Sequence, residues 1–177
     1  RSSWGATLGG PLSPDRAFFF ASVERLDTTS PATVAIAARP DLSGTEPQTT
    51  GRTLAFAKAD LAASPRQHLS LSYRYDGRSQ TNLGVGGGAA ASYGYAQTTR
   101  SEGAVLTHQA TVSGTAFNEL RLTYLGWNQD SSPNSTLPGQ QHPSYSLGGN
   151  PRFPQGGKEL RVGISDVHSL QLGSHFV

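Results

Sequence analysis

The stretch from Gly9 to Phe20 restricts the fold most strongly, because it combines the end of one β-strand, a tight turn and the start of an aromatic-rich strand. Pro14 fixes the first central dihedral angle of a turn, and Asp15 can hydrogen-bond to its neighbouring backbone. Similar junctions recur downstream at 64–67, 113–118 and, more weakly, 172–174. Long segments rich in Gly, Ser, Pro and Thr separate these junctions. The sequence therefore predicts short turns that alternate with long loops.

The segments between the junctions alternate apolar and polar residues with a period of two, which is the pattern of a half-buried strand. This pattern predicts strands at about 3–10, 17–26, 53–62, 68–76, 102–112, 118–127 and 158–170, and an eighth that begins near His175. No long stretch shows a capped 3.6-residue period. The predicted fold class is all-β, an antiparallel up-and-down meander of about 7–8 strands.

The segment 68–76 carries the clearest alternation. Leu69, Leu71, Tyr73 and Tyr75 share one face, and serines and an arginine occupy the other. An aliphatic stripe that ends in tyrosines is typical of a lipid-facing strand bordered by an aromatic belt. Its length approaches the ~9–11 residues that a tilted strand needs to cross a bilayer. We therefore expect residues 1–177 to form part of an outer-membrane β-barrel, with short periplasmic turns and long extracellular loops.

Side-chain faces follow from the same alternation. Phe19, Ala21 and Val23 are expected to lie on the face opposite Phe18 and Phe20. The three phenylalanines are interpreted as strand core, as an aromatic girdle, or as both. Pairing 102–112 with 118–127 through a Gly-Thr-Ala turn keeps the apolar faces of both segments together. Lys58 and Asp60 are expected to face the lumen of the barrel, because a charge on the lipid face costs about 2–4 kcal/mol near the midplane.

Three connections are predicted to be long loops, at 27–52, 77–100 and 128–157. The apolar piece 33–38 within the first is interpreted as a barrel hairpin that extends above the membrane. The glycine-rich piece 83–88 lacks the Lys-Ser/Thr and the βαβ context of a phosphate-binding loop, so a flexible loop is predicted. Asn134 begins a short match to a glycosylation sequon, which alone means little.

Composition narrows the function classes. The chain lacks Cys, which excludes disulfides and Cys-ligated metals, and its net charge of +2 comes without a Lys/Arg cluster, so no nucleic-acid partner is expected. No apolar run approaches the ~18 residues of a transmembrane helix, but barrel strands keep a low hydropathy. The chain begins at Arg1 without Met and ends within a predicted strand, so we expect it to be a fragment of a longer protein.

The segments 4–11 (WGATLGGP), 13–16 (SPDR) and 18–20 (FFF) resemble the first barrel hairpin of TonB-dependent outer-membrane receptors, in particular the Oar-like, carboxypeptidase-regulatory-like subgroup. Further similar segments follow in the same order at 58–60, 69–75, 118–121, 153–156 and 173–175. Each match is short, and their order and spacing carry the resemblance over essentially the whole chain. The resemblance implies that residues 1–177 are the N-terminal part of the barrel, without the plug and the remaining strands.

The resemblance implies energy-coupled uptake of a large nutrient, such as a siderophore, cobalamin or a carbohydrate. In that family a 22-stranded barrel encloses a plug, and the TonB complex contacts an N-terminal box. The implied location is the outer membrane, and the implied partners are outer-membrane lipid, the missing plug and remaining barrel, and the TonB complex through the absent N-terminal region. Plug and box are missing here, so the fragment alone is expected to be inactive. A soluble extracellular β-sandwich or adhesin module and a passive porin-like barrel remain alternatives.

Candidate site residues are few. The histidines at 68, 108, 142, 168 and 175 show no metal-binding spacing. They are expected to be barrel or loop residues that bind no metal, with metal-ligand pairs across neighbouring strands as the alternative. The strand charges are expected to form ordinary lumen-facing ion pairs, or else to hold the plug or guide substrate; they are Glu24, Lys58, Asp60, Arg74, Glu119 and Arg121. No nucleophile elbow or paired carboxylate with a raised pKa is present. We therefore predict no enzyme, no catalytic, metal or cofactor site, and substrate contacts in the long loops.

Overall fold

The protein is described here by a computed structural model that covers residues 1–173, 175 and 176. Ser174 of the predicted last junction and Val177 lie outside the described residues. The strands are β1 (Ser2–Ser13), β2 (Ala17–Val34), β3 (Gly44–Ser64), β4 (Gln67–Leu83), β5 (Tyr95–Ser113), β6 (Ala116–Pro133), β7 (Gln140–Gln141), β8 (Ser146–Leu147), β9 (Gln155–Leu172) and β10 (His175–Phe176). Two short 3-10 turns are η1 (Pro40–Leu42) and η2 (Ala91–Tyr93).

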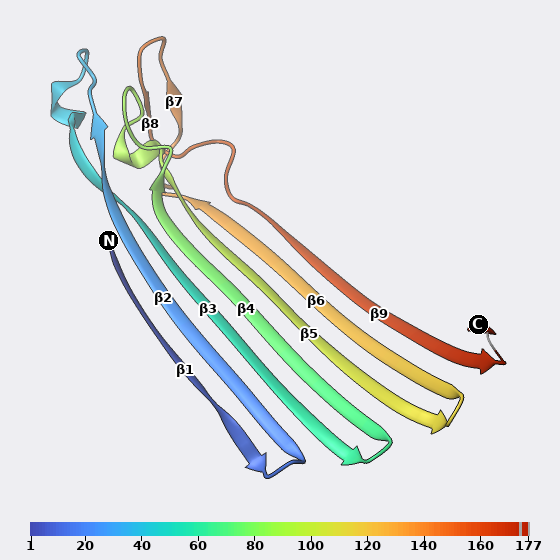
Figure 1. The fold of residues 1–177 in the computed structure, drawn as a ribbon. Coiled ribbons are helices and arrows are strands. Elements are labelled where there is room, and N and C mark those ends of the chain that lie inside the picture. Colours follow the sequence, from blue (N-terminus) through green and yellow to red (C-terminus); the bar gives the residue numbers. More distant parts are fainter. Residues whose placement is uncertain (174, 177) are drawn as a thin grey trace.

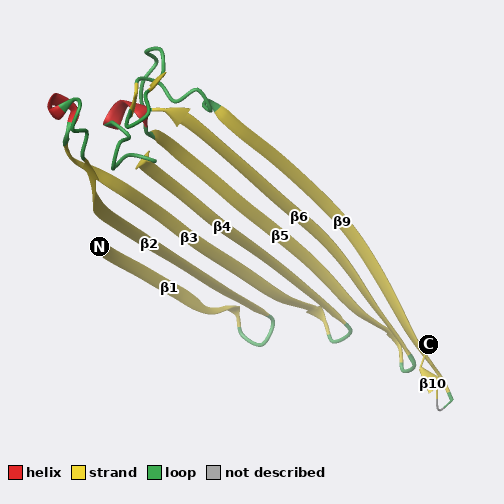
Figure 2. Ribbon diagram, turned by 90° about the horizontal axis from the view of Figure 1, so that it is seen from above, coloured by secondary structure: helices red, strands yellow, loops and turns green. Residues whose placement is uncertain are grey.

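The long strands form one antiparallel sheet in the order β1-β2-β3-β4-β5-β6-β9-β10, and β7 and β8 form a separate two-stranded ribbon. Figures 1 and 2 show these strands side by side in a single layer, with the long loops gathered at one end and the short turns at the other. The predicted all-β up-and-down meander is confirmed. The sheet is open, because its first and last strands, β1 and β10, are not paired with each other.

The tight junctions fall where the sequence predicts them. In the first, the amide of Arg16 donates to the carbonyl of Ser13 at 3.2 Å, and Asp15 adopts a positive φ of 56°. A short polar side chain tolerates this left-handed conformation better than a branched one. The turn joins β1 to β2 in a continuous ladder from Ser2–Asp27 to Pro11–Phe18, with a register shift beside the turn.

The strands are much longer than predicted, and this corrects the predicted loops 27–52, 77–100 and 128–157. β2 runs on to Val34 and β3 begins at Gly44, so the two pair without a break from Ala17–Leu61 to Val34–Gly44. Only 35–43, 84–94 and 134–154 lie between the long strands at this end. The added strand portions are rich in Thr, Ser and Gln on both faces. Their backbone pairing therefore continues where the apolar alternation has already ended.

The sheet has almost no core of its own. Among the described residues the buried hydrophobic side chains are Val34, Ile36, Val85 and Ala90, all at the loop end. Large hydrophobic side chains within the sheet remain exposed, for example Leu71 at 50% and Ile164 at 75%. A folded domain normally packs two layers around a core. This sheet therefore needs another medium or molecule against its faces.

The long loops form a small packed cap, defined here as residues 33–43, 84–94 and 134–149. Ile36 is 2% exposed within it, and Leu42, Tyr145 and Leu147 pack against its four-residue core. Backbone hydrogen bonds join the three loops, including Ala35 to Gly87 at 2.7 Å and Ala90 to Ser146 at 2.9 Å. The piece 33–38 is thus the centre of the cap, where Val34 ends β2. The glycine-rich piece 83–88 is a packed part of the cap, contrary to the predicted flexible loop.

Candidate functional site

One face of the sheet carries a continuous apolar band. Leu71, Leu106, Leu122 and Ile164 are direct cross-strand neighbours on β4, β5, β6 and β9. Directly opposite residues share a face of the sheet, and the same row continues through Ala59 to Phe19. The band is made of Ala6, Leu8, Phe19, Ala21, Val23, Ala55, Ala57, Ala59, Leu69, Leu71, Tyr73, Ala104, Leu106, Leu120, Leu122, Tyr124, Leu160, Val162 and Ile164.

Tyrosines form the border of the apolar band toward the loop end. The hydroxyl groups of Tyr73 and Tyr124 donate to Glu102 at 2.9 and 3.1 Å, and Arg100 donates to the same carboxylate at 2.8 Å. The Arg100 guanidinium also lies 5.6 Å from the ring centre of Tyr75. Glu102 is on the apolar face, and these three donors satisfy its charge at the band's edge. Tyrosine has this amphipathic role wherever one end of the ring is apolar and the other is wet.

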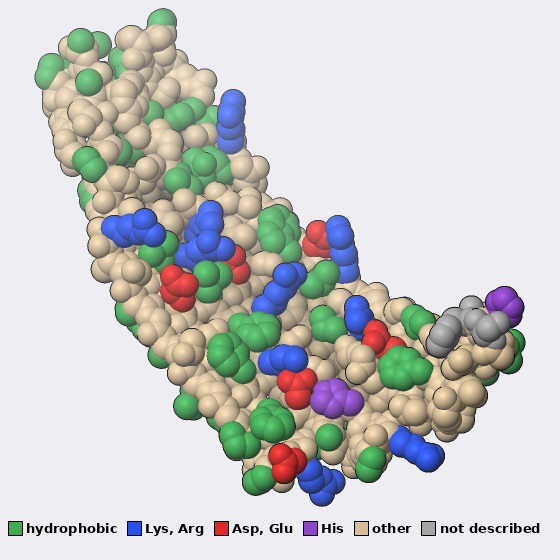
Figure 3. Space-filling model, in the orientation of Figure 1, with side chains coloured by type: hydrophobic (Ala, Val, Ile, Leu, Met, Phe, Trp, Pro, Cys, Tyr) green, Lys and Arg blue, Asp and Glu red, His purple; other side chains and the backbone are tan. Residues whose placement is uncertain are grey.

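The opposite face, named here the charged face, carries all six of the strand charges predicted as candidates. Lys58 and Asp60 lie 3.0 Å apart, and Arg121 and Glu119 lie 2.9 Å apart. This confirms ion pairs for four of the six. Glu24 and Arg74 form no ion pair with the described residues. Figure 3 shows charged side chains spread over the middle and lower parts of the sheet, with hydrophobic side chains between them.

Two further ion pairs of the charged face lie outside the predicted candidates. Arg52 donates to both carboxylate oxygens of Asp76 at 2.9 and 2.6 Å, and Arg161 donates to Glu159 at 2.6 Å. Arg52 lies before the predicted start of its strand. The signal that could have found it is the cross-strand register, which needs the full length of β3 and β4.

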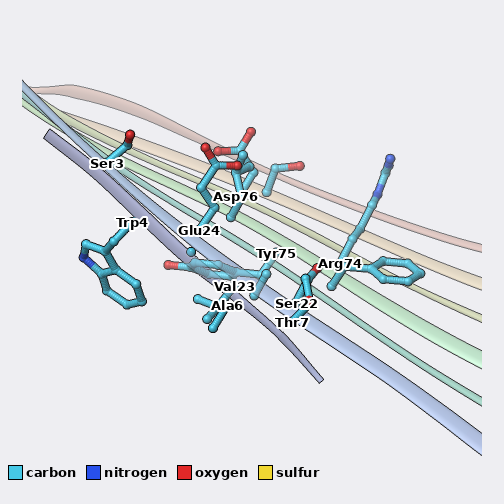
Figure 4. Close-up of a pocket in the computed structure, with 15 residues that line it drawn as sticks. Ser3, Trp4, Ala6, Thr7, Ser22, Val23, Glu24, Arg74, Tyr75 and Asp76 are labelled. Carbon is cyan, nitrogen blue, oxygen red and sulfur yellow. The ribbon is translucent and has the colours of Figure 1, made fainter. Parts of the chain in front are cut away.

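A broad hollow of about 900 Å³ lies near the free edge of the sheet and is lined by residues of β1 to β5. Figure 4 shows Glu24, Arg74 and Asp76 rising on one side of the strands and Trp4 on the other. Phe56 also lines the hollow, and its ring centre lies 6.2 Å from that of Phe20 outside it. The hollow thus combines charged and aromatic side chains, which could contact a polar solute or another protein segment.

The histidines do not form a cluster among the described residues. His68 lies 3.6 Å from Asp60, and His168 lies 3.2 Å from Asp166, so each has a carboxylate neighbour. His108 is on the apolar face between Leu69 and Leu120. His142 stacks on Tyr145 in the cap, and His175 pairs with Leu172 across the last turn. No group of three or more potential metal ligands occurs within residues 1–173, 175 and 176.

Polar side chains of the cap have structural partners. The amide nitrogen of Asn134, in the predicted sequon, donates to Asn82 at 2.8 Å and to the Ala91 carbonyl at 2.9 Å. Arg39 donates two hydrogen bonds to Asp41, at 2.9 and 2.6 Å. These hydrogen bonds lower the pKa of Asp41 below its ordinary value, with a smaller coulombic contribution from Arg39.

No helix in the described part of the chain has the length and apolarity to cross a membrane. Comparisons with protein-family models, with the curated proteins and with the solved structures found no match to this chain.

Proposed function

We propose that this chain is a membrane-spanning segment of an outer-membrane β-barrel. The observation that carries the proposal is the broad apolar band on one face of a sheet that has almost no core. Bands of this kind, bordered by aromatic residues and backed by a polar face, are typical of barrel strands in lipid. Burial in lipid would stabilise side chains such as Leu122 and Ile164, which are 40% and 75% exposed in the isolated sheet.

The charged face would then line the interior of the barrel. Its ion pairs, among them Lys58–Asp60 and Arg52–Asp76, suit a water-filled or protein-filled lumen. The unpaired edges of β1 and β9 would continue into further strands, because a spanning sheet cannot leave backbone groups unpaired in lipid. A β-sandwich would instead need a second large sheet over one face, and the described residues form one large sheet with a small ribbon.

For the whole protein we propose energy-coupled uptake of a large nutrient, a siderophore, cobalamin or a carbohydrate, by a TonB-dependent receptor. This part rests on the resemblance of the first hairpin and of the later short segments. The plug, the remaining strands and the TonB complex are its proposed partners. Uptake by cells that carry the whole gene should stop when the inner-membrane proton gradient is dissipated. Unchanged uptake would favour a passive, porin-like barrel.

The membrane proposal is tested by a matched pair of substitutions on adjacent residues of β6. Leu122 is in the apolar band, and Thr123 is on the charged face opposite Val105 and Gly163. We expect Leu122→Arg to destabilise the folded, vesicle-inserted state by about 2–4 kcal/mol and Thr123→Arg to leave it nearly unchanged. The measurement is urea unfolding of the protein in phosphatidylcholine vesicles. Equal effects of the two variants would contradict a lipid-facing band.

A further inference from the structure

A second, smaller hollow lies on the charged face between Arg74 of β4 and Trp127 of β6. Its volume is about 340 Å³, and its lining includes Arg74, Ser101, Leu125, Trp127, Glu159 and Arg161. Small-molecule sites are usually concave, begin at ~300 Å³, and combine apolar walls with a few polar groups. The hollow therefore has the size and composition of a small-ligand site.

The guanidinium groups of this hollow are not all paired. Its lining holds the guanidinium groups of Arg74 and Arg161 and the carboxylates of Glu102 and Glu159. Glu159 accepts from Arg161 at 2.6 Å, and Glu102, whose side chain is on the apolar face, accepts from Arg100 at 2.8 Å. No carboxylate of the described residues lies within 4.0 Å of the Arg74 guanidinium. The carboxylate of Asp76, two residues further along the same strand, is paired with Arg52. A free guanidinium beside a hollow is a donor fork suited to a carboxylate or a phosphate.

The floor beneath Arg74 is small and uncharged. Strand β5 contributes Ser101 and Gly103, and Gly103 lies between Arg74 and Leu125 in the cross-strand register. A Cβ atom on Gly103 would lie 3.1 Å from Arg74 Nε and 2.9 Å from Leu125 Cδ2. Both side chains therefore lean over the glycine. A larger residue there would displace the arginine from the hollow.

The far wall is apolar and flat. Trp127 is 38% exposed and leans over Gly157, where a Cβ atom would lie 3.2 Å from its ring. Together with Leu125, the indole presents a surface on which a planar ring can stack. An ordinary inorganic anion would leave this wall unused.

We infer that this hollow binds a small aromatic carboxylate, with the carboxylate on Arg74 and the ring against Trp127 and Leu125. The inference deepens the proposed function, on which it rests, because it places an anion-binding step on the interior wall of the barrel. The apolar surface of Trp127 and Leu125 favours a ligand with a ring over a free phosphate. The single unpaired guanidinium, that of Arg74, matches a ligand with one negative charge.

The test uses Trp127 as its own reporter. The chain has two tryptophans, so Trp4→Phe leaves Trp127 as the single fluorophore. This variant is inserted in phosphatidylcholine vesicles and titrated with benzoate, with benzamide as the neutral ring control and acetate as the ringless anion control. We expect saturable quenching by benzoate alone. Adding Arg74→Gln should weaken the affinity ~10-fold or more, as expected for loss of a charge-assisted hydrogen bond.

The matched control is Arg121→Gln, which removes another arginine of the charged face, outside the hollow. It should leave the benzoate titration unchanged. Equal binding of benzamide, no effect of Arg74→Gln, or an equal effect of Arg121→Gln would overturn the inference. Insertion is scored separately by circular dichroism of the floated vesicles. Inserted protein that does not bind benzoate refutes the proposed ligand site and leaves the membrane proposal standing. Protein that fails to insert is titrated in detergent micelles, where the absence of benzoate binding likewise refutes the ligand site, whereas the membrane proposal is tested by the Leu122 and Thr123 variants.

Discussion

At the scale of the residue, aromatic side chains compensate for glycines in the strands. Tyr75 lies over Gly77, and Tyr124 lies over Gly126, where a Cβ atom would be 2.9 Å from the tyrosine hydroxyl oxygen. Glycine weakens a strand because it offers no side chain to pack, and an aromatic neighbour can cover the gap. The tyrosines are thereby held along the sheet surface, which directs Tyr124 toward Glu102.

The Arg39–Asp41 pair of the cap gives a prediction for a single ionisable group. Asp41 has a lowered pKa because Arg39 donates hydrogen bonds to it, so its charged form is favoured in the folded state. This stabilisation is complete above the ordinary aspartate pKa and is lost as the pH falls through the lowered value. In Arg39→Gln, carboxyl NMR titration should show the Asp41 pKa rising to its ordinary range. Arg66→Gln, at the short turns, should not shift it.

At the scale of the element, the cap is a cooperative unit that depends on its buried aliphatic residues. Ile36 is 2% exposed, whereas Leu137 in the last loop is 68% exposed. We expect Ile36→Ala to destabilise the cap by about 2–5 kcal/mol, because it removes apolar burial and leaves a cavity. Leu137→Ala should have little effect. Chymotrypsin cleavage after Tyr145, which packs against the core of the cap, followed by mass spectrometry, measures the opening of the cap; equal cleavage in both variants would contradict a packed core.

The first hairpin gives a second prediction at this scale. Asp15 has a φ of 56°, which glycine adopts freely and a β-branched residue adopts at a cost of about 1–2 kcal/mol. Asp15→Val should therefore lower the urea midpoint of the vesicle-inserted protein, while Asp15→Gly should keep it near the wild-type value. Equal midpoints for the two variants would mean that this turn does not limit stability.

The same elements show how far the sequence predicts this structure. The period-two alternation correctly predicted the half of each long strand next to the short turns. It also assigned Phe19, Lys58 and Leu122 to the correct faces of the sheet, because an apolar band has to stay in register. It failed beyond about Leu26 and Gly77, where Thr, Ser and Gln occupy both faces and only backbone pairing continues the strand. The cap and the Arg52–Asp76 pair depend on contacts between distant segments, which no local pattern encodes.

In the whole molecule, the two ends of the sheet differ in the length and packing of their connections. The cap gathers the long loops at one end, and the short turns close the other (Figure 1). The apolar band lies between them, and the tyrosine border and Glu102 mark its limit toward the cap. If this band spans a bilayer, the cap and the short turns lie on opposite sides of the membrane.

The absence of cysteine from the sequence makes this arrangement measurable. Thr136 in the cap and Thr115 in the turn between β5 and β6 are both exposed, so Thr136→Cys and Thr115→Cys should not disturb folding. With each variant inserted in sealed vesicles, a membrane-impermeant maleimide should label complementary fractions that add to one, whatever the ratio of the two orientations. Detergent should bring both variants to full labelling. Full labelling of both in intact vesicles would mean that the sheet does not cross the bilayer.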